Sequence, residues 1–336
     1  MYQFEIKGNE AGQRLDKYLH KLLPKAPASF FYKMLRKKNI VLNGEKAEGK
    51  EKLVLGDQVS FFLSENTFRS FQEDEGKVDE YLKAYESLKG IEVLFENDHV
   101  VLLNKPVGIL SQKALKEDLS LNEWLIGYLL QKKSISGREL TTFRPSICNR
   151  LDRNTSGIVI CSKSLAGSRE LNRLIAHREI RKFYRLFVKG TVEGEEIIEG
   201  YLSKDKASNK VWIESEDKLP EFDLTEKPSY IKTRYYPLKK LSDMTYLEVE
   251  LITGKTHQIR AHMASIGHPL LGDYKYGDGS FNKKYKDKYG ITMQLLHSYR
   301  LEFPKNALLF GGESRTFVAD EPEIFPRLIE EDSKKG

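Results

Sequence analysis

The stretch Asn149-Arg150-Leu151-Asp152-Arg153-Asn154-Thr155-Ser156-Gly157 places one carboxylate between two arginines, directly before a turn. The apolar residues that follow, Ile158 to Cys161, predict a buried strand. A carboxylate at this position has rigid backbone on one side and cationic donors around it, and both favour a fixed, ionised group. Asp152 is therefore a candidate base or nucleophile. The alternative is a loop aspartate that caps a turn.

Three blocks, in this order along the chain, resemble the signatures of one enzyme family. They are Asn-Lys-Pro-x-Gly at 104–108, Arg-Leu-Asp-x-x-Thr-Ser-Gly at 150–157, and Thr-Gly-Lys-Thr-His-Gln-Ile-Arg at 253–260, the last followed by Gly-His-Pro at 267–269 and Gly-Asp at 272–273. The sequence resembles the RluA-type pseudouridine synthases, which isomerise uridine in ribosomal and transfer RNA. The resemblance covers most of the chain.

Length and composition fit a globular protein of more than one domain. The 336 residues allow two domains, and 40% hydrophobic with 31% charged residues is ordinary for such a chain. We find no apolar run of the roughly 20 residues that span a bilayer and no signal-peptide pattern. The two cysteines, Cys148 and Cys161, cannot make a disulfide framework. We therefore expect a cytoplasmic protein.

The positive charge is concentrated near the amino terminus. The net charge is +6, and residues 12–63 alone hold eleven Lys/Arg and five Asp/Glu, a balance of +6. A segment with this excess is expected to bind a phosphate backbone. The alternative is a charged helix face that is only solvated.

Residues 1–63 predict a small basic α/β domain. Gly12 to Leu23 has apolar residues on one helical face, and Ser29 can cap a second helix. A short sheet follows, with Asn43-Gly44 as its hairpin turn. This arrangement resembles the RNA-binding module of a small-subunit ribosomal protein, which many synthases of the family carry. The exposed cations predicted to contact the RNA backbone are Lys33, Arg36, Lys37 and Lys38.

The remaining chain predicts a linker, a catalytic domain and a tail. Residues 64–90 are polar and allow at most a short helix, residues 91–325 form the catalytic domain, and residues 326–336 are a tail. In the catalytic domain strands outnumber helices and are mostly separated by turns. We therefore expect the α+β class, with a mixed, mainly antiparallel sheet and flanking helices. The resemblance implies the same fold, with the active site in a cleft across the sheet.

The resemblance implies three catalytic residues. Asp152 is the family's catalytic carboxylate, although the sequence leaves open whether it attacks the sugar, attacks the base or removes a proton. Tyr184 matches the active-site tyrosine, whose ring can stack on uracil. Arg260 matches the arginine that pairs with the aspartate and keeps it ionised.

Four further residues are predicted to bind substrate. Arg150 and Leu296 match residues that hold the flipped nucleotide and pack the uracil, and Thr155 and His257 lie within the motif blocks.

Two positions depart from the commonest form of the family. Asn149 stands where a histidine is usual, so we doubt a direct catalytic role there. Lys255 replaces an arginine in the third block and keeps only the charge.

Other functions are weighed against this one. His257 and His262 are poorly spaced for a metal, and no supporting histidine makes Cys148 a nucleophile. A non-catalytic RNA-binding assembly factor would not need the three catalytic residues, and a hydrolase usually needs a second carboxylate. We expect an RNA pseudouridine synthase without cofactor or metal. Its substrate is expected to be large-subunit ribosomal RNA rather than transfer RNA. A monomer without an obligatory protein partner is the simplest expectation.

Overall fold

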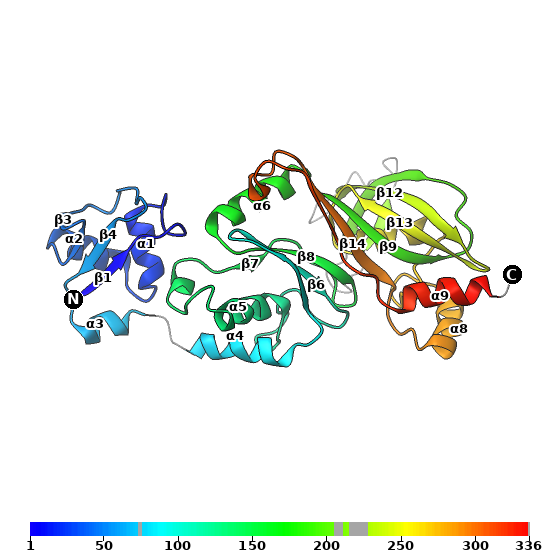
Figure 1. Ribbon diagram of the computed structural model, residues 1–336, viewed down its shortest axis with the longest axis horizontal. Helices are drawn as coiled ribbons and strands as arrows, with labels where there is room; N and C mark the ends of the chain where they lie inside the picture. The colour runs from blue at the N-terminus through cyan, green and yellow to red at the C-terminus, as the bar shows by residue number, and fades with distance from the viewer. Residues whose placement is uncertain (73–75, 205–210, 215–227, 335–336) are drawn as a thin grey trace.

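The computed structural model describes residues 1–72, 76–204, 211–214 and 228–334. They form a small N-terminal module (residues 1–63) and a larger body that is built around one long sheet (Figure 1). Two helices, α3 (Glu65–Ser70) and α4 (Gly76–Ser87), lie between them in the chain. Within the described residues, no helix has the length and apolar composition that crossing a bilayer requires.

The N-terminal module is a four-stranded antiparallel sheet that packs against two helices. Its strands lie in the order β1-β4-β2-β3. The elements are β1 (Tyr2–Glu5), α1 (Leu15–Leu22), α2 (Ala28–Arg36), β2 (Ile40–Leu42), β3 (Glu45–Lys46) and β4 (Gln58–Phe61). The predicted apolar face of α1 is confirmed: Leu15, Tyr18, Leu19 and Leu22 are all buried. Burial of each such leucine stabilises the fold by roughly 1.5–3 kcal/mol.

The start of α2 differs from the prediction. The helix begins at Ala28, and Pro27 rather than Ser29 occupies the N-cap position. Proline has no backbone N–H to satisfy, and its φ of −69° leads directly into the first turn. Ser29 therefore lies inside the helix, where it is exposed.

Much of the segment predicted as a linker is helical and packs into the larger body. Helix α4 lies against α5 (Leu121–Gln131), and Tyr81 of α4 is buried there. The two helices approach so closely that a Cβ on Gly127 would overlap the carbonyl of Tyr81. Glycine at that position permits the packing, which the polar composition of residues 64–90 did not indicate.

The larger body has an 11-stranded sheet within the described residues. The main strand order is β11-β10-β12-β13-β9-β14-β8-β6-β5, with β7 beside β8 and β15 beside β14. All pairings are antiparallel except that of β8 with β14, which is parallel. The predicted α+β class with a mainly antiparallel sheet is therefore confirmed.

Figure 1 shows the flanking helices of this sheet. The remaining elements, in chain order, are β5 (Glu92–Glu96), β6 (Val100–Lys105), a 3₁₀ helix (Glu139–Thr141), β7 (Ser146–Ile147), β8 (Ser156–Ser162), α6 (Leu165–Ala176), β9 (Arg181–Lys189), β10 (Glu196–Lys204), β11 (Val211–Glu214), β12 (Ser229–Lys240), β13 (Met244–Leu251), α7 (Gln258–Ser265), α8 (Gly279–Tyr289), β14 (Leu296–Phe303), a 3₁₀ helix (Leu308–Phe310), β15 (Arg315–Val318) and α9 (Ile324–Ser333).

The glycine of the opening stretch is required by the parallel pair of strands. Gly157 of β8 lies opposite Ser298 of β14, and its φ is 106°. A Cβ at this position would overlap the backbone of Ser298. Only glycine allows this approach. It brings the loop that carries Asp152 next to the start of β14, where Leu296 lies.

The N-terminal module contacts the larger body through polar side chains. The Thr142 hydroxyl donates a hydrogen bond to the Glu10 carboxylate at 2.6 Å, and Glu10 is only 6% exposed. The backbone N–H of Leu165 donates to the side-chain oxygen of Asn9 at 2.9 Å. Because Leu165 is the first residue of α6, a side chain of the module satisfies one of the free N–H groups at the start of that helix.

The residues predicted as a tail are mostly helical. Helix α9 buries Phe325 and Leu328, and the Phe325 ring packs against Phe187 of β9. The four apolar residues Ile324, Phe325, Leu328 and Ile329 fall on one face of the helix. This apolar face explains why the end of the described chain is part of the core.

Candidate active site

A cavity of about 700 Å³ opens beside the loop before β8. The candidate catalytic and substrate-binding residues predicted from the motif blocks all line it: Arg150, Asp152, Thr155, Tyr184, His257, Arg260 and Leu296. They come from the β7–β8 loop, from β9, from the start of α7 and from β14. A volume of this size is typical of sites that enclose a small ligand, roughly 300–1,000 Å³.

Hydrogen bonds fix the backbone on both sides of Asp152. The Ser111 hydroxyl donates to the carbonyl of Leu151 at 2.7 Å and accepts from the Leu151 N–H at 3.0 Å. On the other side, the Arg153 carbonyl accepts a hydrogen bond from Lys105 Nζ at 3.1 Å. The carboxylate between them is therefore held in place before any substrate binds.

Lys105 has a structural role that explains the Asn-Lys-Pro-x-Gly block. It is completely buried, and its ammonium group donates to the carbonyls of Pro106, Ile109 and Arg153 at 3.0, 2.9 and 3.1 Å. Burial lowers the pKa of Lys105 to about 8, while the negative charge of Asp152 acts in the opposite direction. Three carbonyls match the three N–H bonds of an ammonium group. This lysine joins the 105–109 turn to the Asp152 loop.

Arg260 connects two carboxylates. Its Nη1 donates to Asp152 Oδ2 at 2.9 Å, and its Nε and Nη2 donate to Asp273 at 2.6 and 2.9 Å. Burial acts to lower the pKa of Arg260, but its hydrogen bond to Asp273 and the charges of both carboxylates outweigh burial and raise the pKa. Arg260 therefore stays charged beside Asp152.

Asp273 is not available as a second catalytic carboxylate. It is fully buried, both of its oxygens bind Arg260, and one also accepts the backbone N–H groups of Lys275 and Tyr276. Burial acts to raise the pKa of Asp273, yet these donors lower it below its usual value. The site has one accessible carboxylate, which does not suit a hydrolase that needs a pair of them.

His257 lies between Asp152 and Tyr276. Its Nδ1 is 2.9 Å from the Tyr276 hydroxyl oxygen, and its Nε2 is 3.7 Å from Asp152 Oδ2. Burial lowers the pKa of His257, although the charge of Asp152 acts against this. The imidazole is therefore neutral at physiological pH. His257 has a φ of 57° at the N-cap of α7, a left-handed conformation that is uncommon for histidine.

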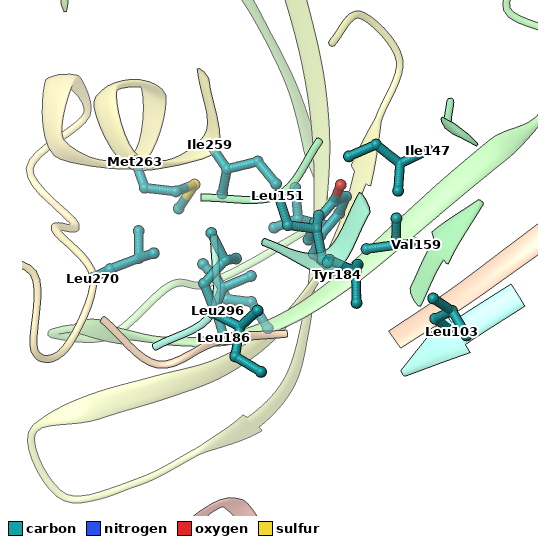
Figure 2. Packing of buried hydrophobic residues seen from close by; sticks show 14 of the residues in the cluster. Leu103, Ile147, Leu151, Val159, Tyr184, Leu186, Ile259, Met263, Leu270 and Leu296 are labelled. Carbon is teal, nitrogen blue, oxygen red and sulfur yellow. The ribbon is translucent and has the colours of Figure 1, made fainter. Parts of the chain in front are cut away.

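Tyr184 and Leu296 form an apolar wall of the cavity. Tyr184 lies on β9, and burial raises the pKa of its hydroxyl to about 12. Leu296 is the first residue of β14, the strand that pairs with β9. Both belong to the same hydrophobic cluster as Leu151, the neighbour of Asp152 (Figure 2). A flat ring and an aliphatic side chain beside a carboxylate can hold a planar base against the reacting group.

The other motif residues differ in their surroundings. Thr155 is buried, and its hydroxyl oxygen has no hydrogen-bond partner in the part of the chain that the structure describes. Arg150 is exposed at the cavity. The side-chain oxygen of Asn149 accepts the backbone N–H of Ile160 at 2.7 Å. The side-chain oxygen of Asn149 therefore supports strand β8, and Asn149 also lines the cavity.

The predicted RNA-backbone cations lie in the N-terminal module, apart from the cavity. Lys33, Arg36, Lys37 and Lys38 are all exposed, at or just after the C-terminal end of α2. Cations at this end of a helix are favoured by its dipole. The structure does not bring them together with Asp152.

Metal and thiol chemistry find no support in the local geometry. The ring nitrogen Nδ1 of His262 pairs with the Thr233 hydroxyl at 2.8 Å, whereas His257 faces Tyr276. Across the described ranges, no three His, Cys, Asp or Glu side chains are grouped as metal ligands. Burial raises the pKa of the Cys148 thiol, which keeps it protonated.

Sequence reasoning assigned no role to several residues that support the site. Lys105 and Asp273 lie in the quoted motif blocks, but lysine and aspartate are rarely buried unless they are paired, so the sequence did not indicate their burial. Ser111 and Tyr276 carry no such signal, because their partners are distant in sequence. Their roles depend on contacts that only the folded chain makes.

Comparison with known proteins gives one consistent result. Residues 99–265 match the family model of the RNA pseudouridylate synthases. The chain is 30% identical over 308 residues to an uncharacterized RNA pseudouridine synthase of Mycoplasma genitalium, covering 90% of this chain and 89% of that protein. It is also 30% identical over 322 residues to the ribosomal large subunit pseudouridine synthase C of Haemophilus influenzae, covering 94% and 89%. The solved structure of human RNA pseudouridylate synthase domain containing 4 shares the fold, with a TM-score of 0.57 at 19% identity over 74% of this chain and 94% of that one.

Proposed function

Because this chain belongs to the RNA pseudouridine synthases, in the RluA-type group, we propose that it isomerises specific uridines of large-subunit ribosomal RNA with Asp152 as the catalytic carboxylate. The choice of RNA is supported by the Haemophilus influenzae relative, which is named for the large ribosomal subunit. Transfer RNA is the alternative substrate. We propose a monomer as the simplest state for this function.

One observation carries the assignment of the site. The Asp152 carboxylate lines the cavity, its neighbouring peptides are fixed, and a buried arginine donates to it at 2.9 Å. Arg260 orients the carboxylate through this hydrogen bond and places a positive charge beside it. An oriented carboxylate at the cavity is the group that we assign to glycosidic bond cleavage at uridine.

The chemistry divides among the remaining residues. Pseudouridine forms when the N1–C1′ bond breaks, the uracil turns, and C5 bonds to C1′; C5 loses its proton and N1 gains one, so the product is an isomer of uridine. Flipping the uridine out of folded RNA costs a few kcal/mol. We assign Tyr184 and Leu296 to holding the uracil, Thr155 to hydrogen bonding with the nucleotide, His257 to substrate binding beside Asp152, and Arg150 to the phosphate or the flipped conformation.

The N-terminal module is proposed to hold the RNA backbone. Its four exposed cations at the end of α2 provide charge without specific base contacts. Their separation from the cavity fits two tasks performed by two regions: the module binds folded RNA, and the cavity performs the reaction on one nucleotide.

A pseudouridine map of ribosomal and transfer RNA tests this function. We compare cells with and without the gene, and complement the deletion with wild type, with Asp152→Asn, or with Asp98→Asn as a control. Asp98 is an exposed aspartate on the turn before β6. Sites in large-subunit ribosomal RNA should vanish on deletion and return with wild type and Asp98→Asn only.

Two outcomes would contradict parts of the proposal. Sites that vanish from transfer RNA instead would overturn the substrate and leave the catalytic assignment in place. Restoration by Asp152→Asn would overturn the assignment of the carboxylate. Purified Asp152→Asn should still bind the RNA with near wild-type affinity, because the basic module is untouched.

A further inference from the structure

We propose that Tyr276 is a positioning residue of this site: its hydroxyl fixes the tautomer of His257, so that the Nε2–H of the imidazole faces Asp152. The inference rests on the proposed role of Asp152. It adds a residue outside the described motif blocks, one that lies in the turn after Asp273 and does not line the cavity.

A chain of hydrogen bonds sets the direction of the Tyr276 hydroxyl. The backbone N–H of Val211 donates to its oxygen at 3.0 Å, so the oxygen accepts on that side. The hydroxyl proton then needs an acceptor of its own. His257 Nδ1, at 2.9 Å, is in position to accept it.

The opposite tautomer leaves one group without a partner. If Nδ1 of His257 carried the proton, the Tyr276 oxygen would accept two N–H groups and its own proton would have no acceptor among the described residues. Tyr276 is half-buried, and the loss of one hydrogen bond there costs roughly 0.5–1.5 kcal/mol, which favours the tautomer with the proton on Nε2. Burial lowers the pKa of His257, so the neutral ring, which has only one N–H, is the relevant form.

In the selected tautomer, the two carboxylate oxygens of Asp152 have different surroundings. Arg260 donates to Oδ2 at 2.9 Å, and Nε2 of His257 faces the same oxygen at 3.7 Å. Both donors are on one side, which leaves Oδ1 as the oxygen available to the nucleotide. At 3.7 Å the imidazole is beyond hydrogen-bonding distance, and such contacts shorten when substrate closes a site.

Tyr276 also packs against both donors. Its ring centroid lies 5.1 Å from the guanidinium carbon of Arg260, and it meets the His257 ring edge-on at 5.5 Å. One side chain therefore contacts the two groups that face Asp152 Oδ2. Through Val211 of β11, it connects them to the edge strand of the sheet.

The tautomer can be measured directly in the unmodified protein. Nitrogen NMR of the ¹⁵N-histidine-labelled full chain separates protonated from unprotonated ring nitrogens, and His257→Gln assigns the resonance. We expect His257 to show a protonated Nε2 and a hydrogen-bonded, unprotonated Nδ1 at neutral pH. A protonated Nδ1 would overturn the proposal; the tautomer is read from the wild-type chain, and the variant serves only to assign the resonance.

Tyr276→Phe then tests the consequence for the reaction. This variant keeps the ring and removes only the hydroxyl, so His257 should become a mixture of tautomers. We expect kcat for RNA to fall about ten-fold, the size of effect of one lost hydrogen bond, with KM unchanged. Tyr274→Phe is the matched control, because Tyr274 is exposed in the same turn and its hydroxyl donates to the carbonyl of Ile291 instead of to His257.

The outcomes separate this inference from the proposed function. Wild-type kcat and unchanged nitrogen shifts in Tyr276→Phe would overturn the positioning role, even if Asp152→Asn abolishes the reaction. If kcat falls by the same factor in Tyr274→Phe as in Tyr276→Phe, the conformation of the turn, and not the Tyr276 hydroxyl, is responsible for the loss of activity. If Asp152 proves dispensable, the tautomer of His257 still stands on the NMR measurement alone.

Discussion

Arg260 and Asp273 form a two-pronged ion pair beneath the cavity, with Nε to Oδ2 at 2.6 Å and Nη2 to Oδ1 at 2.9 Å. The side chains are 8% and 0% exposed. Because the third nitrogen of the same guanidinium reaches Asp152, the orientation of the reactive carboxylate depends on an aspartate outside the cavity lining. The pair is therefore structural and functional at once.

Asp273→Asn should lower both stability and activity. The substitution removes the charge that compensates Arg260 at a buried position, and breaking such a pair costs about 3–5 kcal/mol. Urea unfolding measures the loss. Asp287→Asn is the control, since Asp287 forms an exposed pair with Lys283 that contributes at most about 0.5 kcal/mol. Equal losses in the two variants would contradict our account of the buried pair.

Lys105→Met should slow the reaction without changing any residue that touches RNA. The methionine fills a similar volume but leaves the carbonyls of Pro106, Ile109 and Arg153 without their donor. A shift of the Asp152 loop by about 1 Å is expected to cost on the order of 10²-fold in kcat. Lys305→Met, on the exposed surface, should leave kcat unchanged. Wild-type kcat in Lys105→Met would show that the loop does not need this support.

Stability should fall as the pH drops below about 6.5. Burial lowers the pKa of both His262 and His297 to about 4. Between pH 4 and pH 6.5 the unfolded chain binds protons that the native chain does not. The free energy of unfolding is therefore largest above pH 6.5 and falls toward pH 4. The loss is roughly 3 kcal/mol for each histidine.

Urea unfolding across this pH range measures the effect. His262→Gln should remove about half of the pH dependence that the two histidines produce. His177→Gln, at an exposed position, should leave the slope unchanged. A slope that is the same in wild type and His262→Gln would contradict the assignment.

Removing charge from α2 should weaken RNA binding and its salt dependence together. Lys33→Gln combined with Lys37→Gln removes two cations from one face of the helix. If both contact phosphates, the slope of log affinity against log salt should become shallower by about one to two. Lys286→Gln with Lys305→Gln removes the same charge from exposed positions of the larger body. A change of equal size in the control pair would point to net charge and not to contact by the module.

The sequence predicted the candidate catalytic side chains better than it predicted the residues that hold them in place. Asp152 and Arg260 lie in two of the blocks, Tyr184 lies on β9, and the fold brings all three to the cavity. Tyr276 and Ser111 escaped prediction, since their partners lie far away in sequence and hydroxyl groups occur everywhere. The three-residue chain from Val211 to His257 exists only after the sheet has formed.

Two segments pack more closely than their composition indicates, and for the same physical reason. Residues 64–90 and 326–336 are polar on average, yet Tyr81 and Leu328 each supply a buried contact from one face of a helix. Average polarity does not reveal a helix that packs through few residues. At α2 the error was local: Pro27 determines the start of the helix, and a serine two residues later had no free N–H left to cap.

Two hydrogen bonds set the distance between the cationic helix α2 and the cavity. They run from Thr142 to Glu10 and from the Leu165 N–H to Asn9. With the roles proposed above, the module and the cavity bind one RNA at two points that are a constant distance apart. We infer that a uridine is selected when a backbone segment of the same RNA lies at that distance, so that two targets with unrelated flanking sequences can be equally good.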